Sequence, residues 1–178
     1  MHVIDTKFKG LKIIQQKKIG DSRGNLRETF KKKIIKWDNL IFDYVTASKK
    51  NVLRGFHFNS KFPQAKFVTV LKGKILDYVL DLRRKSKTFG KSFSIVLSEN
   101  NCKSMYIPEG FAHAYYSFAK LNLIYYKLSD YYKPKYESRI LWNGKGLRLK
   151  WPTNKPILAE RDWKWGTFID LKKVYKGF

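Results

Sequence analysis

Short runs of β-branched and aromatic residues recur along the chain, and several of them alternate apolar with polar positions. The stretch Lys74–Leu82 has this period of two, which is typical of a β-strand with one face buried. The same criterion predicts strands at Leu11–Ile14, Leu26–Phe30, Ile41–Thr46, Val52–Phe58, Lys66–Leu71, Lys74–Leu82, Phe93–Leu97, Ser104–Ile107, Ala112–Phe118 and Asn122–Leu128.

Turn signals separate these runs, at Gly20-Asp21, Lys72-Gly73, Ser98–Asn101 and Pro108–Gly110. Many short strands at fairly regular spacing predict an all-β sandwich or barrel of the jelly-roll kind. Short peripheral helices are expected at Lys31–Asp38 and around Ile169–Val174. A barrel of this size leaves a mouth open at one end, so we look for functional residues among the side chains that face inward there.

The length of 178 residues suits one domain, and we expect a single domain over residues 1–178. The N-terminal stretch is polar, without the apolar run of a signal peptide, and no run approaches the roughly 18 apolar residues of a membrane span. Cys102 has no partner for an internal disulfide and suits a reducing compartment. We therefore expect a cytoplasmic protein with no membrane partner, and a packing role for Cys102.

The formal net charge of +24 could indicate a protein that binds nucleic acid or other phosphates. Most of the 38 basic residues are lysines, however, and they are spread over the whole chain. Abundant lysine, asparagine and isoleucine would also follow from an AT-rich genome. We interpret most of these lysines as a solvated surface and expect no nucleic acid partner.

Candidate chemistry centres on the histidines. His2 is terminal, whereas His57 lies in a strand-like segment between Phe56 and Phe58 and faces the other way from both. A histidine in a strand is more often structural than catalytic, and the same caution applies to His113. His57-Phe58-Asn59 lacks the second histidine of a cupin metal site, so we expect no metal and no other cofactor.

Motifs for nucleophilic catalysis and Gly-rich phosphate loops are also missing from the sequence. What remains is acid–base chemistry by histidine, tyrosine, lysine and carboxylates in a β-barrel mouth. Such a set suits abstraction of a proton next to a carbonyl group.

A series of motifs carries a resemblance to a known family over nearly the whole chain. In order they are Gly20–Gly24 with Glu28 and Phe30, Val52–Phe58, Gln64–Val68, Asp77–Arg83, Ser86–Lys91, Ile107–His113, Tyr126-Lys127, Asp130–Pro134, Trp151-Pro152 and Leu158–Asp162. Each motif alone is weak, but their order and spacing are specific. The chain resembles the dTDP-4-dehydrorhamnose 3,5-epimerase family.

The resemblance implies a cupin-type jelly-roll homodimer, without metal, that acts on a nucleotide-diphosphate-linked 4-keto-6-deoxy sugar. It implies an epimerase that inverts C3, C5 or both through an enolate, in the biosynthesis of sugars for lipopolysaccharide or capsule. By carry-over, His57 is the general base, Asp162 orients its imidazole, Tyr126 is the acid on the opposite face of the sugar, and Lys66 stabilises the enolate.

The resemblance also implies a set of substrate-binding residues. Arg23 and Arg54 match positions that bind the diphosphate, and guanidinium groups suit phosphate oxygens. His113 is expected to pair with Asp81 and orient the site. The remaining members of the expected set are Glu28, Asn59 and Tyr132.

Some positions depart from the family pattern. Phe42 and Tyr44 stand where members acting on thymidine nucleotides carry Gln and Asn, and Ile19 and Leu26 stand where aromatic residues are usual. An aromatic ring cannot make the hydrogen bonds of an amide. Three alternatives therefore stay open: a 3,5-epimerase for a GDP-linked 4-keto-6-deoxy-heptose, a single-site 3- or 5-epimerase, and a non-catalytic sugar-binding cupin.

Overall fold

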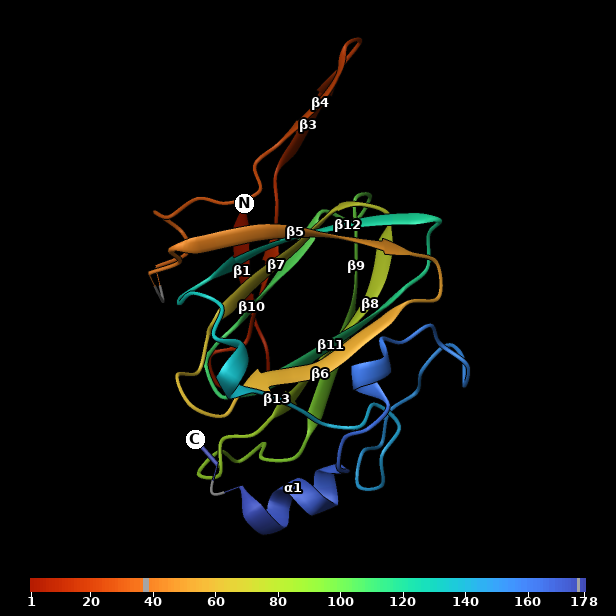
Figure 1. Ribbon diagram of the computed structural model, residues 1–178. Coiled ribbons are helices and arrows are strands. Elements are labelled where there is room, and N and C mark those ends of the chain that lie inside the picture. Colours follow the sequence, from red (N-terminus) through yellow and green to blue (C-terminus); the bar gives the residue numbers. More distant parts are fainter. Residues whose placement is uncertain (37–38, 176) are drawn as a thin grey trace.

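Two antiparallel sheets face each other in the computed structural model, which describes residues 1–36, 39–175 and 177–178 (Figure 1). Over these residues the first sheet has six strands, in the order β1 (His2–Asp5), β2 (Lys12–Gln15), β10 (Lys103–Ile107), β7 (Lys66–Lys72), β12 (Leu121–Leu128) and β5 (Phe42–Lys49). The second has five, in the order β13 (Glu137–Arg139), β6 (Leu53–Asn59), β11 (Phe111–Ser117), β8 (Lys74–Asp81) and β9 (Ser92–Ser98).

The main core lies between the two sheets, because each sheet turns one apolar face toward the other. Val68 and Ile124 come from the six-stranded sheet, and Val79 and Tyr115 come from the five-stranded sheet, and all four are buried in one cluster. The expected all-β, cupin-type jelly roll with short peripheral helices is confirmed.

The C-terminal part of the chain covers the outer face of the five-stranded sheet. Phe56 and Phe58 point outward from β6 into a second cluster that includes Phe168 of α1 (Phe168–Val174). The helix begins with a capping box between Thr167 and Asp170, which satisfies its first backbone N–H groups. Of the helices in the described ranges, none is long and apolar enough to cross a membrane.

Most of the predicted elements are confirmed, with shifts of one or two residues at their ends. The helix predicted around Ile169–Val174 is α1. The strand predicted at Leu26–Phe30 lies earlier in the chain, at β4 (Gly24–Arg27), and the two overlap only at Leu26 and Arg27. The helix predicted at Lys31–Asp38 is wrong over 31–36, which form turns, and residues 37–38 lie outside the described residues. Three lysines at its start oppose the helix dipole.

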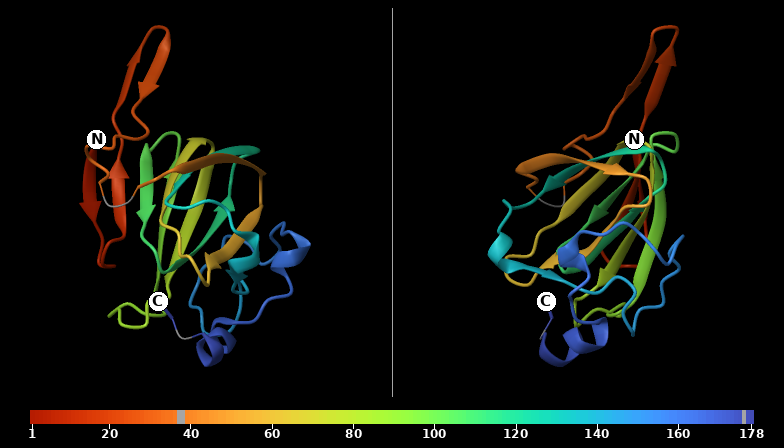
Figure 2. Two further views of the ribbon diagram at one scale, coloured as in Figure 1. Left: turned by 60° about the vertical axis from the view of Figure 1, so that its left-hand side comes forward. Right: turned by 45° about the vertical axis from the view of Figure 1, so that its right-hand side comes forward.

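A hairpin of β3 (Lys18–Asp21) and β4 projects from the body, as both views in Figure 2 show. Side-chain hydrogen bonds fix the base of the hairpin, where its two strands join the body. Gln16 donates hydrogen bonds to Ser104 Oγ at 2.7 Å and to the Thr29 carbonyl at 2.8 Å, and Arg27 donates to the Val70 carbonyl at 2.7 Å. The tip has no such support, so the hairpin is fixed at its base and exposed beyond it.

Gly55 allows β6 to approach β11 closely beside the candidate site. Its φ is +115°, and a Cβ placed there would lie 2.4 Å from the His113 carbonyl oxygen. The pairing of the two strands changes register at this point, between His113↔His57 and Tyr115↔Arg54. A residue without a side chain is needed where two backbones come this close.

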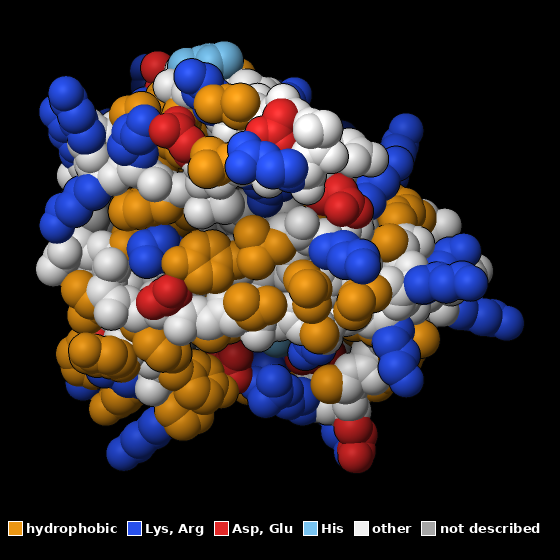
Figure 3. Space-filling model, turned by 90° about the horizontal axis from the view of Figure 1, so that it is seen from above, with side chains coloured by type: hydrophobic (Ala, Val, Ile, Leu, Met, Phe, Trp, Pro, Cys, Tyr) orange, Lys and Arg blue, Asp and Glu red, His pale blue; other side chains and the backbone are white. Residues whose placement is uncertain are grey.

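Basic side chains are distributed around the surface rather than gathered in one patch on the face shown in Figure 3. Acidic and apolar side chains lie between them on this face. Exposed pairs such as Lys31 with Glu28 and Lys164 with Glu160 contribute little to stability, because water screens them.

Candidate active site

A cavity of about 510 Å³ opens between the two sheets. Its lining combines aromatic rings with charged and polar groups, as enzyme pockets usually do. His57 reaches it from β6 of one sheet, while Lys66 of β7 and Tyr126 of β12 reach it from the other. The lining residues are Phe42, Tyr44, Thr46, Arg54, His57, Phe58, Asn59, Gln64, Lys66, His113, Tyr115, Tyr126, Leu128, Tyr132, Glu137 and Arg161.

The imidazole of His57 is held by a carboxylate that does not line the cavity. Its Nε2 lies 2.9 Å from Oδ1 of Asp162, which is buried in the short 3₁₀ helix Glu160–Asp162. A carboxylate at this distance accepts the Nε2–H proton, so the lone pair of the neutral imidazole lies on Nδ1.

Glu137 and Arg139 complete the surroundings of this histidine from the three-residue strand β13, which pairs with β6. Glu137 Oε1 lies 3.7 Å from His57 Nδ1. The Arg139 guanidinium forms an ion pair with Glu137 and lies 3.5 Å from Asp162 Oδ1. One guanidinium thus contacts both carboxylates that flank His57.

Lys66 places an amine in the cavity opposite His57. Burial lowers the pKa of this amine to about 8, while the charges of Glu137 and Asp77 act in the opposite direction. An ammonium group in such partly buried surroundings interacts more strongly with a negative oxygen than it would in bulk water.

Tyr126 lies on the same sheet as Lys66, with its ring buried. Burial raises the pKa of its phenol well above the usual value, and the nearby Tyr115 and Tyr44 phenols add to the effect. The phenol therefore stays protonated, which makes it a possible proton donor. Its ring stacks on that of Tyr44, with centroids 5.0 Å apart.

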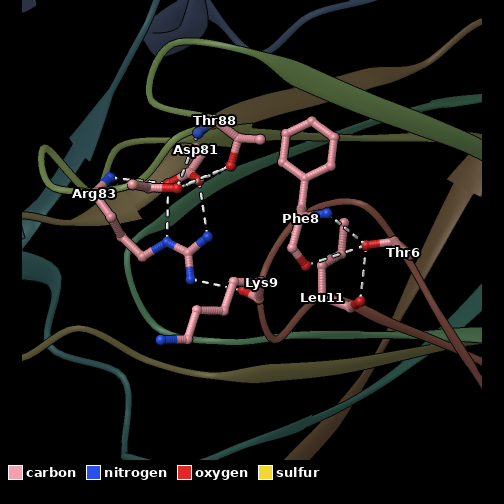
Figure 4. Close-up of polar contacts among 8 residues, drawn as sticks. Thr6, Phe8, Lys9, Leu11, Asp81, Arg83 and Thr88 are labelled. Atoms are coloured by element: carbon pink, nitrogen blue, oxygen red, sulfur yellow. Dashed lines mark hydrogen bonds and ion pairs between the residues drawn. The ribbon is translucent and has the colours of Figure 1, made fainter.

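His113 pairs with Asp77, and the predicted pair with Asp81 is wrong. Asp77 and Asp81 lie on the same face of β8, diagonal to His113 in the register of β11 with β8. Local groups of the following turn bind Asp81 instead: Arg83 Nε at 2.9 Å and Thr88 Oγ1 at 2.6 Å (Figure 4). Asp77 is left to His113, and burial raises the pKa of its carboxyl against the opposing influence of that histidine.

The other expected substrate-binding residues fall into two groups. Arg54, Asn59 and Tyr132 line the cavity. Arg23 and Glu28 do not line it in their own chain: Arg23 lies at the tip of the hairpin with a side chain 88% exposed, and Glu28 binds Lys31 near its foot.

A metal site is not evident in the described ranges, which contain no group of three or more His, Cys, Asp or Glu side chains placed to hold an ion. The two histidines of the cavity are each bound to a carboxylate, His57 to Asp162 and His113 to Asp77. One nitrogen of each ring, Nε2, is thus engaged in a hydrogen bond that orients the ring.

Sequence reasoning missed several residues of the cavity and its surroundings: Glu137, Arg139, Arg161 and Asp77 in its pairing with His113. The alternation of charges in Glu137-Ser138-Arg139 is a strand signal, but three residues are too few to separate it from a loop. Arg161 stands directly before Asp162 in the sequence, so the prediction of Asp162 as a site residue was the signal that could have indicated Arg161.

Comparison with known proteins gives consistent matches over the chain. The family model for dTDP-4-dehydrorhamnose 3,5-epimerase matches residues 5–170. Relatives described by that name include one from Methanothermobacter thermautotrophicus, 35% identical with 91% of each chain covered, and one from Salmonella typhimurium, 36% identical with 91% of this chain and 92% of the relative covered. A Legionella pneumophila 3,5-epimerase crystallised with dTDP-4-keto-L-rhamnose is 34% identical, with a TM-score of 0.88, and the match covers 93% of this chain and 92% of that one.

The fold and the cavity define a jelly-roll enzyme with groups for acid–base chemistry on two facing walls. The chain belongs to the dTDP-4-dehydrorhamnose 3,5-epimerase family. It is an epimerase, and therefore an isomerase, of nucleotide-sugar metabolism.

The Lys66 amine provides a direct test of the cavity's electrostatics. We expect it to titrate near pH 8 instead of near 10.5, and Glu137→Gln to lower its pKa further by removing the largest favourable charge. The measurement is the pH dependence of the lysine Cε signal in ¹³C-lysine-labelled protein, assigned with Lys66→Arg. Glu160→Gln, at an exposed ion pair with Lys164, is the control and should leave the value unchanged. A Lys66 titration near 10.5 would contradict this description of the pocket.

Proposed function

We propose that this protein inverts C3 and C5 of a dTDP-linked 4-keto-6-deoxy sugar by removing a proton from one face of the ring and returning one to the other. The observation that carries the proposal is that His57 and Tyr126 line one cavity from two facing sheets, with Lys66 beside them. Inversion needs a base and an acid on opposite sides of the sugar, and this arrangement supplies both.

The reaction begins with the ketone at C4. A carbon–hydrogen bond next to it breaks only if the resulting enolate oxygen is stabilised, and the Lys66 ammonium supplies a positive charge for that oxygen. His57 accepts the proton on Nδ1, and its imidazolium is stabilised by Asp162. The electron pair of the broken bond becomes the enolate.

The second half of the reaction adds a proton to the same carbon from the other side. Tyr126 donates it, because its phenol stays protonated in the buried site and the enolate is the stronger base. The proton on His57 passes to solvent and the Tyr126 phenolate regains one, so the enzyme returns to its starting state. A repeat at the second carbon completes the double inversion.

The substrate assignment follows the relatives, which are described as dTDP-4-dehydrorhamnose 3,5-epimerases, and the Legionella enzyme that binds dTDP-4-keto-L-rhamnose. They do not favour the GDP-linked alternative or a non-catalytic role. Arg54 and Arg161 are basic groups of the cavity that suit the diphosphate, and Tyr132, Asn59 and His113 suit the nucleoside and sugar. We place the enzyme in the cytoplasm, in the supply of sugars for surface polysaccharide.

We further propose a homodimer in which the hairpin of each chain lies over the partner's cavity. Ile19 and Leu26 are paired across the hairpin and are 53% and 63% exposed, and an isolated two-stranded ribbon is marginal in water. A second copy would cover this apolar pair. It would also bring Arg23 and Glu28, which are outside the cavity of their own chain, to a site where they can contact substrate.

The epimerase proposal predicts isotope exchange. In deuterated water with dTDP-4-keto-6-deoxyglucose, we expect deuterium at C3 and C5, and His57→Asn should lower the rate about 10²- to 10⁴-fold, as loss of a general base does. Nuclear magnetic resonance of the sugar measures both positions. His2→Asn, at an exposed histidine of β1, should keep the rate of the unaltered protein. Exchange only into a GDP-linked 4-keto sugar would contradict the substrate assignment, and exchange into neither would contradict the reaction.

The dimer proposal predicts complementation between two inactive variants. Arg23→Ala should raise KM because a diphosphate contact is lost, and His57→Asn should remove nearly all turnover, as above. If Arg23 acts across the dimer, mixing the two after dissociation and reassembly restores about a quarter of full activity at low substrate, since half the dimers are mixed and each has one intact site. No recovery, in a mixture that mass spectrometry shows to contain mixed dimers, would contradict it.

A further inference from the structure

Tyr44 occupies an unusual place beside the proposed proton donor. It lies on β5, the edge strand of the six-stranded sheet, directly opposite Tyr126 in the register of β5 with β12. Their rings are stacked, with centroids 5.0 Å apart and an interplanar angle of 24°. Tyr44 in turn contacts Phe42, which contacts Tyr131, so a row of aromatic rings runs from Tyr126 outward.

Tyr126 is buried in the main core cluster, and two aromatic rings contact its own ring directly, Tyr44 and His113. His113 contacts it in an edge-on geometry, with centroids 6.0 Å apart, and His113 is itself held by Asp77. Among the described residues, none forms a hydrogen bond with the Tyr126 hydroxyl. The direction of the phenol is therefore set by packing, to which the stack with Tyr44 and the edge contact with His113 contribute.

The direction of that hydroxyl affects how well it can donate a proton. A proton is transferred efficiently only when donor and acceptor are aligned within hydrogen-bonding distance, and a displacement of about 1 Å can cost about 10²-fold in rate. Stacked aromatic pairs contribute attraction beyond the area they bury, which favours one ring position over others.

We propose that Tyr44 is a positioning residue that holds Tyr126 in line with the sugar carbon and so couples proton removal to inversion. This rests on the proposed function, in which His57 removes the proton and Tyr126 returns one on the opposite face. The ring of Tyr44 performs this role through the stack; its own hydroxyl is not needed. Burial raises the pKa of Tyr44 to about 12, so it remains an uncharged neighbour throughout the neutral range.

Loss of the stack should separate two quantities that a general loss of structure would lower together. One is the rate at which deuterium from solvent enters the sugar, which requires only His57 and the enolate. The other is the rate of inversion, which also requires an aligned Tyr126. When Tyr126 is misaligned, His57 returns a deuteron to the face from which it took the proton, and exchange occurs without inversion.

The experiment compares four variants in deuterated water with dTDP-4-keto-6-deoxyglucose. The ratio of exchange to inversion at each carbon is measured by nuclear magnetic resonance. We expect Tyr44→Val to raise the ratio about tenfold or more. Valine is chosen because it favours strands. Tyr44→Phe should keep the ratio within about twofold. Val45→Ala, on the same strand but facing outward and 52% exposed, is the matched control. Tyr126→Phe sets the ratio for complete loss of the donor.

The outcomes separate this inference from the function on which it rests. If Tyr126→Phe raises the ratio and Tyr44→Val does not, the positioning role is wrong while the acid assignment stands. If Tyr126→Phe leaves the ratio unchanged, the acid assignment itself fails, and the role of Tyr44 with it. A large change in Tyr44→Phe would show that the hydroxyl acts directly, which also overturns the proposal. Should Tyr44→Val not fold, Tyr44→Leu carries the same comparison.

Discussion

The His57 imidazole and the Tyr126 phenol face one cavity from two different sheets, and the rest of the molecule serves to keep them there. Neither group could be placed by local sequence, because strands β6 and β12 are joined only through the packing of the whole sandwich. Gly55 brings β6 close to β11, and Asp162 fixes the imidazole from outside the cavity. The geometry of the reaction is thus a property of the tertiary fold.

The same cavity carries an electrostatic cost. Lys66 and Asp77 are charged groups in surroundings with little water, where each charge is unfavourable without a partner. Arg139 between Glu137 and Asp162, and His113 beside Asp77, reduce this cost by pairing charges. Groups preorganised in this way need no rearrangement when an enolate forms, which is how enzymes gain rate from electrostatics.

Much of the fold could be predicted from the sequence, since alternation along strands such as Lys74–Leu82 directly reflects a buried and an exposed face. Alternation placed His57 on the opposite face of its strand from Phe56 and Phe58, and the structure adds that the histidine faces the cavity. The pairing of His113 could not be predicted, because Asp77 and Asp81 share one face of β8, and only the donors of the next turn decide between them. Glu137 and Arg139 were missed because β13 is too short to show a period.

Departures from the family pattern carry information of a different kind. Phe42 and Tyr44 were noted as changes that remove amide groups, and the structure adds that they form an aromatic row ending on Tyr126. Substitutions that look like losses of hydrogen bonding can therefore act through packing. The contact between Tyr44 and Tyr126 depends on the register of β5 with β12, which cannot be read from the sequence pattern of either strand alone.

The most direct test of the central claim is a crystal structure of the protein with a dTDP-linked sugar in its cavity. We expect the sugar ring to lie between the imidazole of His57 and the hydroxyl of Tyr126, with the C4 substituent directed at the Lys66 amine. A complex in which both side chains meet the same face of the ring, or in which the sugar lies outside the space between them, would contradict the account.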